Sequence, residues 1–142
     1  MDPRISFVTL ACPDLDAVRA FYVDGLGWPL EVDVPGEVLM IRVGERLVLS
    51  LWSEAGFAAE VGPVRRGEGL VPMTLSHNVA SPAEVDAVLA EARAAGAPTV
   101  EDGRAREWGG YSGYFADPAG FRWEVAHNPQ EIGTSVVPPR SG

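Results

Sequence analysis

Few side chains in this sequence can act as nucleophiles, bases or metal ligands. The chain has two histidines, His77 and His127, and a single cysteine, Cys12. All eleven basic residues are arginines, which excludes mechanisms that use a lysine as a Schiff-base nucleophile or general base. One cysteine allows no intramolecular disulfide, so Cys12 is interpreted as a small buried hydrophobic residue. The remaining candidates are carboxylates and aromatic side chains.

Glu124 is the carboxylate with the strongest functional interpretation. It lies on a strand predicted over residues 121–127, where one face carries the apolar residues Phe121, Trp123 and Val125. Side chains alternate between the two faces of a strand, so Glu124 points to the opposite face. There a carboxylate can bind a cationic or hydrogen-bond-donating group, or act as a general base. A structural ion pair with Arg122 or Arg46 is the alternative interpretation.

Three aromatic residues, Trp52, Trp108 and Tyr111, are candidates for the wall of a ligand pocket. The strand predicted over 46–52 has a leucine-rich core face, which leaves Ser50 and Trp52 on the other face. Trp108 and Tyr111 lie in a glycine-rich segment from which they could close over a ligand. Packing against the following segment is the alternative for Trp52, and burial of a β-bulge is the alternative for Trp108 and Tyr111.

The elements that position these residues form an internal repeat at about half the chain length. In each half a β-rich segment, residues 5–12 or 71–79, leads into a helix with a capping residue. Asp14 caps the helix predicted near 15–24, and Ser81 caps the helix predicted near 82–95. Three short strands follow each helix, over residues 31–34, 38–43 and 46–52, and over 99–101, 112–116 and 121–127. Each half is therefore predicted to be a βαβββ module.

The repeat and the segments around it predict a single domain over residues 1–142. The first module covers about residues 4–52 and the second about 70–128. Residues 53–69, rich in glycine, alanine and charge, are expected to be a mobile linker. The tail, residues 129–142, contains three prolines and is expected to wrap the surface or fray.

Composition and charge limit the possible partners. The 142 residues carry a net charge of −9, which repels nucleic acid and anionic membranes. No apolar run is long enough to cross a membrane, and the N-terminus has no targeting pattern. We therefore expect neither a nucleic-acid nor a membrane partner, and a cytoplasmic location.

Two motifs give the sequence a resemblance to a known family. The first is the opening strand that leads to Pro-Asp-Leu-Asp, Phe21-Tyr22 and Leu26-Gly27, and the second is Asp117-Pro-Ala-Gly-Phe-Arg-Trp-Glu124. In tandem βαβββ halves, these motifs resemble the vicinal oxygen chelate superfamily, which includes glyoxalase I, extradiol dioxygenases and bleomycin-resistance proteins. The resemblance covers residues 4 to 129. It implies an α+β fold in which a curved mixed sheet surrounds a cavity.

The resemblance also implies where a metal would bind. Enzymes of the superfamily bind a divalent metal through four strand positions, and these fall on Phe7, Ser50, Thr74 and Glu124. Only Glu124 is a competent ligand, because the other three offer a phenyl ring and two weak hydroxyls. We therefore expect no metal and no other cofactor.

The two histidines are the residues that could restore a metal site. If the alignment slips by one or two residues, His77 is to be considered as a displaced ligand for the position of Thr74. Strand alternation instead directs His77 toward the helix side of the sheet, as a hydrogen-bonded core residue. His127 is interpreted as a solvated residue at the end of the last strand.

Two functions of different classes follow. The first is a small-molecule-binding protein that sequesters an aromatic or cationic compound, such as an antibiotic, without metal, and its acidic charge favours a cation. Its ligand-binding residues would be Phe7, Ser50, Trp52, Thr74, Trp108, Tyr111 and Glu124. The alternative is a glyoxalase-like lyase or isomerase with Glu124 as base and a divalent metal. A homodimer is expected in either case, since an open sheet leaves edges and apolar surface to cover.

Overall fold

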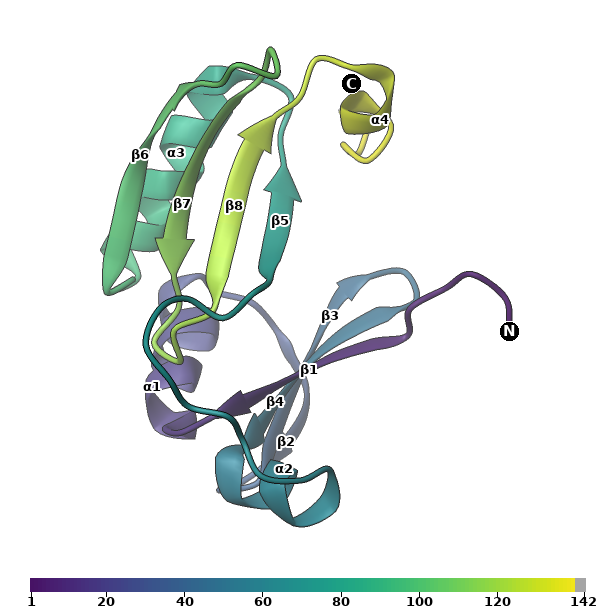
Figure 1. Ribbon diagram of the computed structural model, residues 1–142, viewed down its shortest axis with the longest axis vertical. Coiled ribbons are helices and arrows are strands. Elements are labelled where there is room, and N and C mark those ends of the chain that lie inside the picture. Colours follow the sequence, from purple (N-terminus) through teal and green to yellow (C-terminus); the bar gives the residue numbers. More distant parts are fainter. Residues whose placement is uncertain (140–142) are drawn as a thin grey trace. The chain divides into compact units, whose positions relative to one another are not determined.

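The computed structural model describes residues 1–139, and residues 140–142, the end of the predicted tail, lie outside the described residues. The chain divides into two compact units, of which the first is Met1–Gly69 and the second begins at Leu70. Each unit has the element order βαβββ and one four-stranded mixed sheet (Figure 1). The predicted α+β class with tandem βαβββ modules is therefore confirmed. None of the helices in residues 1–139 is long and apolar enough to cross a membrane.

The first unit is built on one sheet with strand order β1-β4-β3-β2. Its strands are β1 (Phe7–Cys12), β2 (Leu30–Val34), β3 (Val38–Gly44) and β4 (Leu47–Ser53). β1 runs parallel to β4, and the other neighbours are antiparallel. A helix α1 (Leu15–Arg19) continues directly into a π-helical turn η1 (Ala20–Gly25). As predicted, Asp14 caps this helix, and its carboxylate accepts the N–H of Ala17 at 3.0 Å.

The apolar core of the first unit lies between this helix and the sheet. Phe21 and Tyr22 on η1 are almost fully buried and pack edge to face, with ring centroids 5.0 Å apart. Leu49 and Leu51 of β4 are buried as well. Because faces alternate along β4, Ser50 and Trp52 lie on the opposite face of the sheet.

The second unit repeats this plan with the strand order β5-β8-β7-β6. Its strands are β5 (Thr74–Asn78), β6 (Thr99–Ala105), β7 (Tyr111–Ala116) and β8 (Arg122–His127). The helix α3 (Pro82–Ala94) packs against β6, β7 and β8, and lies behind them in Figure 1. Ser81 caps α3 as predicted, since its Oγ accepts the N–H of Glu84 at 3.3 Å.

The core of the second unit lies between α3 and the sheet. Phe115 and Trp123 stack with nearly parallel rings at a centroid distance of 5.9 Å. Val85, Leu89 and Val125 are buried beside them. This arrangement agrees with the assignment of Trp123 and Val125 to the core face, and leaves Glu124 on the face opposite α3.

Three local features differ from the predictions. The segment expected to be a mobile linker begins with a helix α2 (Glu54–Glu60), which Ser53 caps by accepting the N–H of Gly56 at 3.2 Å. β6 continues to residue 105, because a register shift between Glu101 and Arg104 absorbs the extra length. The tail contains a short helix α4 (Glu131–Thr134).

Candidate functional site

Glu124 has one specific partner, Tyr114 on the neighbouring strand. The two residues face each other in the β7–β8 register, and the Tyr114 hydroxyl donates a hydrogen bond of 2.6 Å to Glu124 Oε2. Neither interpretation made from the sequence included this partner. Among the described residues, the salt bridges do not include Glu124, so the proposed ion pair with Arg122 or Arg46 is absent there.

Arg106 contacts Tyr114 and Ser112, both on β7. Its guanidinium lies 5.4 Å from the centroid of the Tyr114 ring, within cation–π distance. Its Nε donates to Ser112 Oγ at 2.9 Å, and its Nη2 donates to the Ser112 carbonyl at 3.0 Å. The hydrogen bond to Glu124, followed by burial, raises the pKa of the Tyr114 hydroxyl. Tyr114 therefore stays a neutral donor at physiological pH.

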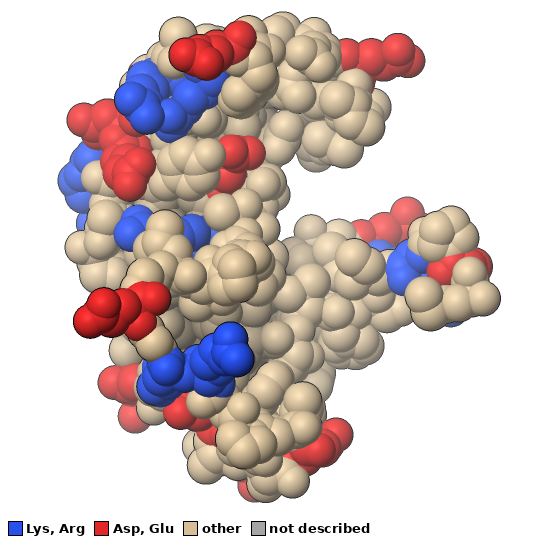
Figure 2. Space-filling view, in the orientation of Figure 1, with Lys and Arg blue, Asp and Glu red and all other residues tan. Residues whose placement is uncertain are grey.

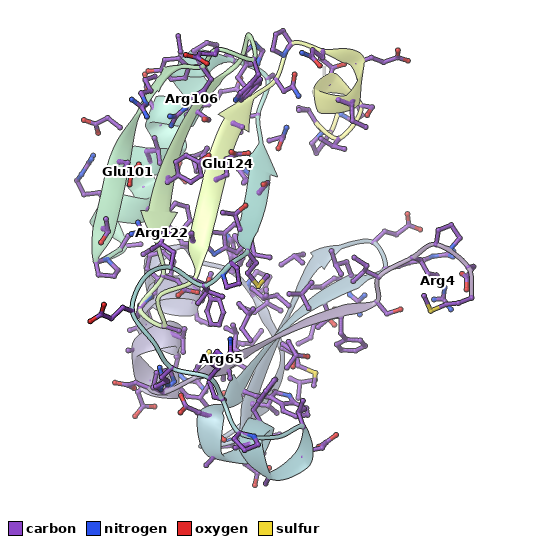
Figure 3. All side chains as sticks on the ribbon, in the orientation of Figure 1. Arg4, Arg65, Glu101, Arg106, Arg122 and Glu124 are labelled. Carbon is purple, nitrogen blue, oxygen red and sulfur yellow. The ribbon has the colours of Figure 1, made fainter. Side chains whose placement is uncertain are left out.

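The face of the second sheet opposite α3 is polar and carries charges of both signs. The register pairs Thr74 with Arg122 and Ser76 with Glu124, so these four side chains share that face. Glu101 pairs with Tyr114 and adds a second carboxylate. Figure 3 shows Glu101, Arg106, Arg122 and Glu124 along this sheet, and Figure 2 shows acidic and basic side chains interspersed over the second unit. Such a face favours ligands with several hydrogen-bonding groups.

The first unit has a pocket of about 440 Å³, which we call the Trp52 pocket. Its lining comes from β3, β4, α2 and the turn before β3, and consists of Glu37, Val38, Met40, Trp52, Ser53, Gly56 and Glu60. Trp52 packs edge to face against Phe57 of α2, with centroids 6.2 Å apart. A volume of several hundred Å³ with an aromatic wall is typical of small-molecule sites.

Phe7 and Ser50 lie on the same face of the first sheet as Trp52. Phe7 pairs with Val48 and is 54% exposed, whereas Ser50 pairs with Thr9 and is 1% exposed. The Oγ of Ser50 has no hydrogen-bond partner among the described residues. Ser50 is therefore a buried hydroxyl group in the middle of β4.

Trp108 and Tyr111 lie at different places in the second unit. Tyr111 is on the α3 side of the sheet, where its hydroxyl donates to Asp86 of α3 at 2.9 Å. This hydrogen bond raises the pKa of Tyr111. Trp108 is 43% exposed in the turn between β6 and β7, and its ring lies over Gly110.

The two histidines and the cysteine differ in exposure. His77 pairs with Val125 on the edge strand β5 and is exposed, which corrects the prediction of a core residue. The reason is that α3 packs against β6, β7 and β8 and does not cover this face of β5. His127 is partly buried, with Nδ1 3.4 Å from the Val79 carbonyl oxygen. Cys12 is buried, as predicted.

Sequence reasoning missed Tyr114, Arg106 and the two glutamates of the Trp52 pocket. A signal for Tyr114 was available. The turn Asp117-Pro-Ala-Gly joins two adjacent strands, and counting outward from it pairs residue 114 with residue 124. Glu37 and Glu60 lie in a turn and a short helix, where strand alternation gives no information.

Tandem βαβββ units with a carboxylate on the last strand define a small two-module protein of the glyoxalase fold. The family model described as Glyoxalase/Bleomycin resistance protein/Dioxygenase superfamily matches residues 4–125. The chain belongs to this superfamily.

Solved structures support the same assignment. A glyoxalase-related enzyme from Fulvimarina pelagi is 32% identical, with 89% of this chain and 88% of that chain covered and a TM-score of 0.79. A lactoylglutathione lyase from Agrobacterium tumefaciens is 28% identical, with 90% and 96% covered and a TM-score of 0.68. A glyoxalase/bleomycin resistance protein/dioxygenase from Nocardioides shares the fold at 23% identity, with 100% and 91% covered and a TM-score of 0.77. No curated protein matches the chain significantly.

The residues at the superfamily's metal positions do not fit a divalent metal. Phe7 has no donor atom, Ser50 and Thr74 offer only hydroxyls, and Glu124 already accepts the Tyr114 hydrogen bond. Within residues 1–139, no group of three or more His, Cys, Asp or Glu side chains is arranged to hold a metal. Divalent transition metals need several such donors held together.

Proposed function

We propose that this protein binds a small aromatic or cationic molecule without a metal. The observation that carries the proposal is the set of side chains at the four metal positions of the superfamily. Among them only Glu124 is a carboxylate, and one of its oxygens accepts the hydrogen bond from Tyr114. Membership of a superfamily of small-molecule proteins and the presence of the Trp52 pocket support it. Glu124, held by the Tyr114 hydroxyl, would then be a hydrogen-bonding group rather than a metal ligand.

The proposal is tested on protein purified without added metal. We expect elemental analysis to find no stoichiometric zinc, nickel, iron or manganese, and a chelator to leave the melting temperature unchanged, because linkage requires a metal that binds the native state. Mass spectrometry of small molecules released on denaturation should reveal a bound compound. About one metal per chain, with Glu124→Gln abolishing its binding, would contradict the proposal.

The second candidate function is a glyoxalase-type lyase with Glu124 as general base. It is favoured by the 28% identity to the Agrobacterium protein named lactoylglutathione lyase and by the carboxylate retained at the last strand. Its test is formation of lactoylglutathione with and without added divalent metal. Metal-dependent turnover that Glu124→Gln abolishes would establish this candidate in place of the first.

We also propose that the protein is a homodimer. Apolar side chains that include Phe7, Val32 and Val34 are exposed on the strands of the first unit. A two-fold interface would remove such surface from water. Analytical ultracentrifugation at micromolar concentration should give twice the chain mass of 15.1 kDa, and a 15.1 kDa species would contradict the proposal.

A further inference from the structure

We infer that the Trp52 pocket holds the positively charged end of the ligand, and that this ligand is a small organic cation with an apolar body. The inference rests on the proposed function and deepens it. It moves the cation site from Glu124, where sequence reasoning placed it, to two glutamates of the first unit.

The wall of the pocket suits an apolar body next to a cation. Val38, Met40 and Trp52 share one face of the first sheet, and their side chains line the pocket. The edge-to-face contact with Phe57 holds the Trp52 ring in a fixed orientation. Tryptophan is the aromatic residue that attracts cations most strongly.

The charge of the pocket is uniformly negative. Glu37 and Glu60 are its charged lining residues, and none of the arginines in residues 1–139 lines it. Other carboxylates on the strands of this unit are already neutralised by an arginine, as in Arg19–Asp33 and Arg42–Glu31. For Glu37 and Glu60 no side-chain hydrogen bond or salt bridge occurs within residues 1–139. Both side chains are exposed, and a bound cation would lie between this pair of carboxylates and the apolar wall of the pocket.

Glu124 is a poorer position for the same cation. One of its oxygens already accepts the Tyr114 hydroxyl, and the sheet face around it also carries Arg106 and Arg122. These guanidinium groups repel a positive ligand. The sheet face around Glu124 therefore carries charges of both signs, whereas the Trp52 pocket carries only unpaired carboxylates, which favour a cation.

The experiment is an NMR titration of ¹⁵N-labelled full-length protein with benzyltrimethylammonium as the probe. The indole N–H signal of Trp52 is assigned by its loss in Trp52→Phe. We expect the probe to shift this signal in a saturable way. Phenylacetate, an anion of similar size, should not shift it, and benzyl alcohol should bind more weakly. An unshifted Trp52 signal, or an equal response to phenylacetate, would overturn the inference.

Matched variants separate a local site from general attraction by an acidic protein. Glu37→Gln/Glu60→Gln should weaken probe binding about tenfold, because it removes both local charges while keeping side-chain shape. Glu45→Gln/Glu107→Gln removes the same charge from exposed turn positions outside the pocket and should change affinity less than about twofold. Equal weakening by both pairs would show that only net charge matters.

The failure of this inference is distinguishable from failure of the proposed function. A stoichiometric metal at Glu124 would contradict metal-free binding but leave the Trp52 titration unchanged. A metal-free protein whose released compound is neutral or anionic, together with an unshifted Trp52 signal, would retain the proposed function and reject the cation site.

Discussion

Asp117 Oδ1 accepts the backbone N–H of Phe121 at 2.9 Å and thereby closes the turn between β7 and β8. The same oxygen accepts the N–H of Ala119 at 3.0 Å, and the carboxylate is completely buried. Residues on either side of this turn pair symmetrically, so its geometry sets the register that brings Tyr114 opposite Glu124. A buried turn carboxylate, three residues from Tyr114 and seven from Glu124 along the chain, thus positions the candidate site.

Removing the turn carboxylate should destabilise the protein strongly. Asp117→Ala leaves two partly buried N–H groups without their acceptor, and we expect a loss of about 2–4 kcal/mol in the free energy of unfolding. Asp117→Asn keeps an oxygen at the same position and should lose less. Urea denaturation measures both values. An Asp117→Ala protein within about 0.5 kcal/mol of the original would contradict this role.

Tyr114→Phe tests the hydrogen bond to Glu124. We expect a loss of about 1–2 kcal/mol in unfolding free energy, because a bond to a charged acceptor is removed from a partly buried site. The pKa of Tyr114 is raised in the folded state by this bond. Its contribution is therefore complete below the usual tyrosine pKa of 10.0 and disappears as the pH rises through the folded value.

The pH dependence gives a direct measurement of that contribution. The difference in stability between the original protein and Tyr114→Phe should be constant from about pH 7 to 9 and shrink at higher pH. Tyr111→Phe, which loses a more exposed bond to Asp86, should give a smaller stability difference with the same direction of pH dependence. A difference that grows above pH 10.0 would contradict the assigned direction of the Tyr114 pKa shift.

Ser50→Ala should be neutral or stabilise the protein by up to about 1 kcal/mol. The Ser50 hydroxyl is buried without a partner among the described residues, so removing it relieves a desolvation penalty. Ser112 is equally buried, but its Oγ accepts Arg106 Nε. Ser112→Ala should therefore cost about 1–2 kcal/mol. Thermal unfolding compares the two, and a Ser50→Ala loss as large as that of Ser112→Ala would indicate a missing partner.

Gly113→Ala should destabilise the second unit by about 1–3 kcal/mol. A methyl group there would lie 2.6 Å from the Glu101 carbonyl oxygen and would also overlap Leu89 of α3. Gly67→Ala is the control, since no atom of residues 1–139 lies within 4 Å of the added methyl group. Chemical denaturation with equal losses for both substitutions would show that the close packing of α3 on β7 is unimportant.

The elements with strong local signals could be predicted from the sequence. Asp14 and Ser81 fix the starts of α1 and α3, and the alternation around Glu124 places it on the correct face. The two βαβββ units follow from these signals and from their repetition. The helix α2 was missed because only seven residues and a serine cap form it, and its glycine and alanine content is equally typical of a linker.

The candidate site was predicted less completely than the fold. A strand pattern tells which face a residue occupies, and this sufficed for Glu124 and Trp52. It does not tell which side chains on that face touch, so the Tyr114–Glu124 bond and the Arg106 contact required the register of both strands. The glycine-rich segment around Tyr111 likewise does not tell that its hydroxyl donates to Asp86 of α3.

The burial of Cys12 at the end of β1 makes its thiol a natural probe of local opening. Its side chain is 1% exposed, and its neighbour across the β1–β4 ladder is Ser53. A thiol reagent can reach the sulfur only when this end of the ladder opens, and no second thiol competes. The rate at which the native protein is labelled therefore reports the free energy of local opening beside the Trp52 pocket. Without any engineered label, a ligand that binds there would be detected as slower thiol modification.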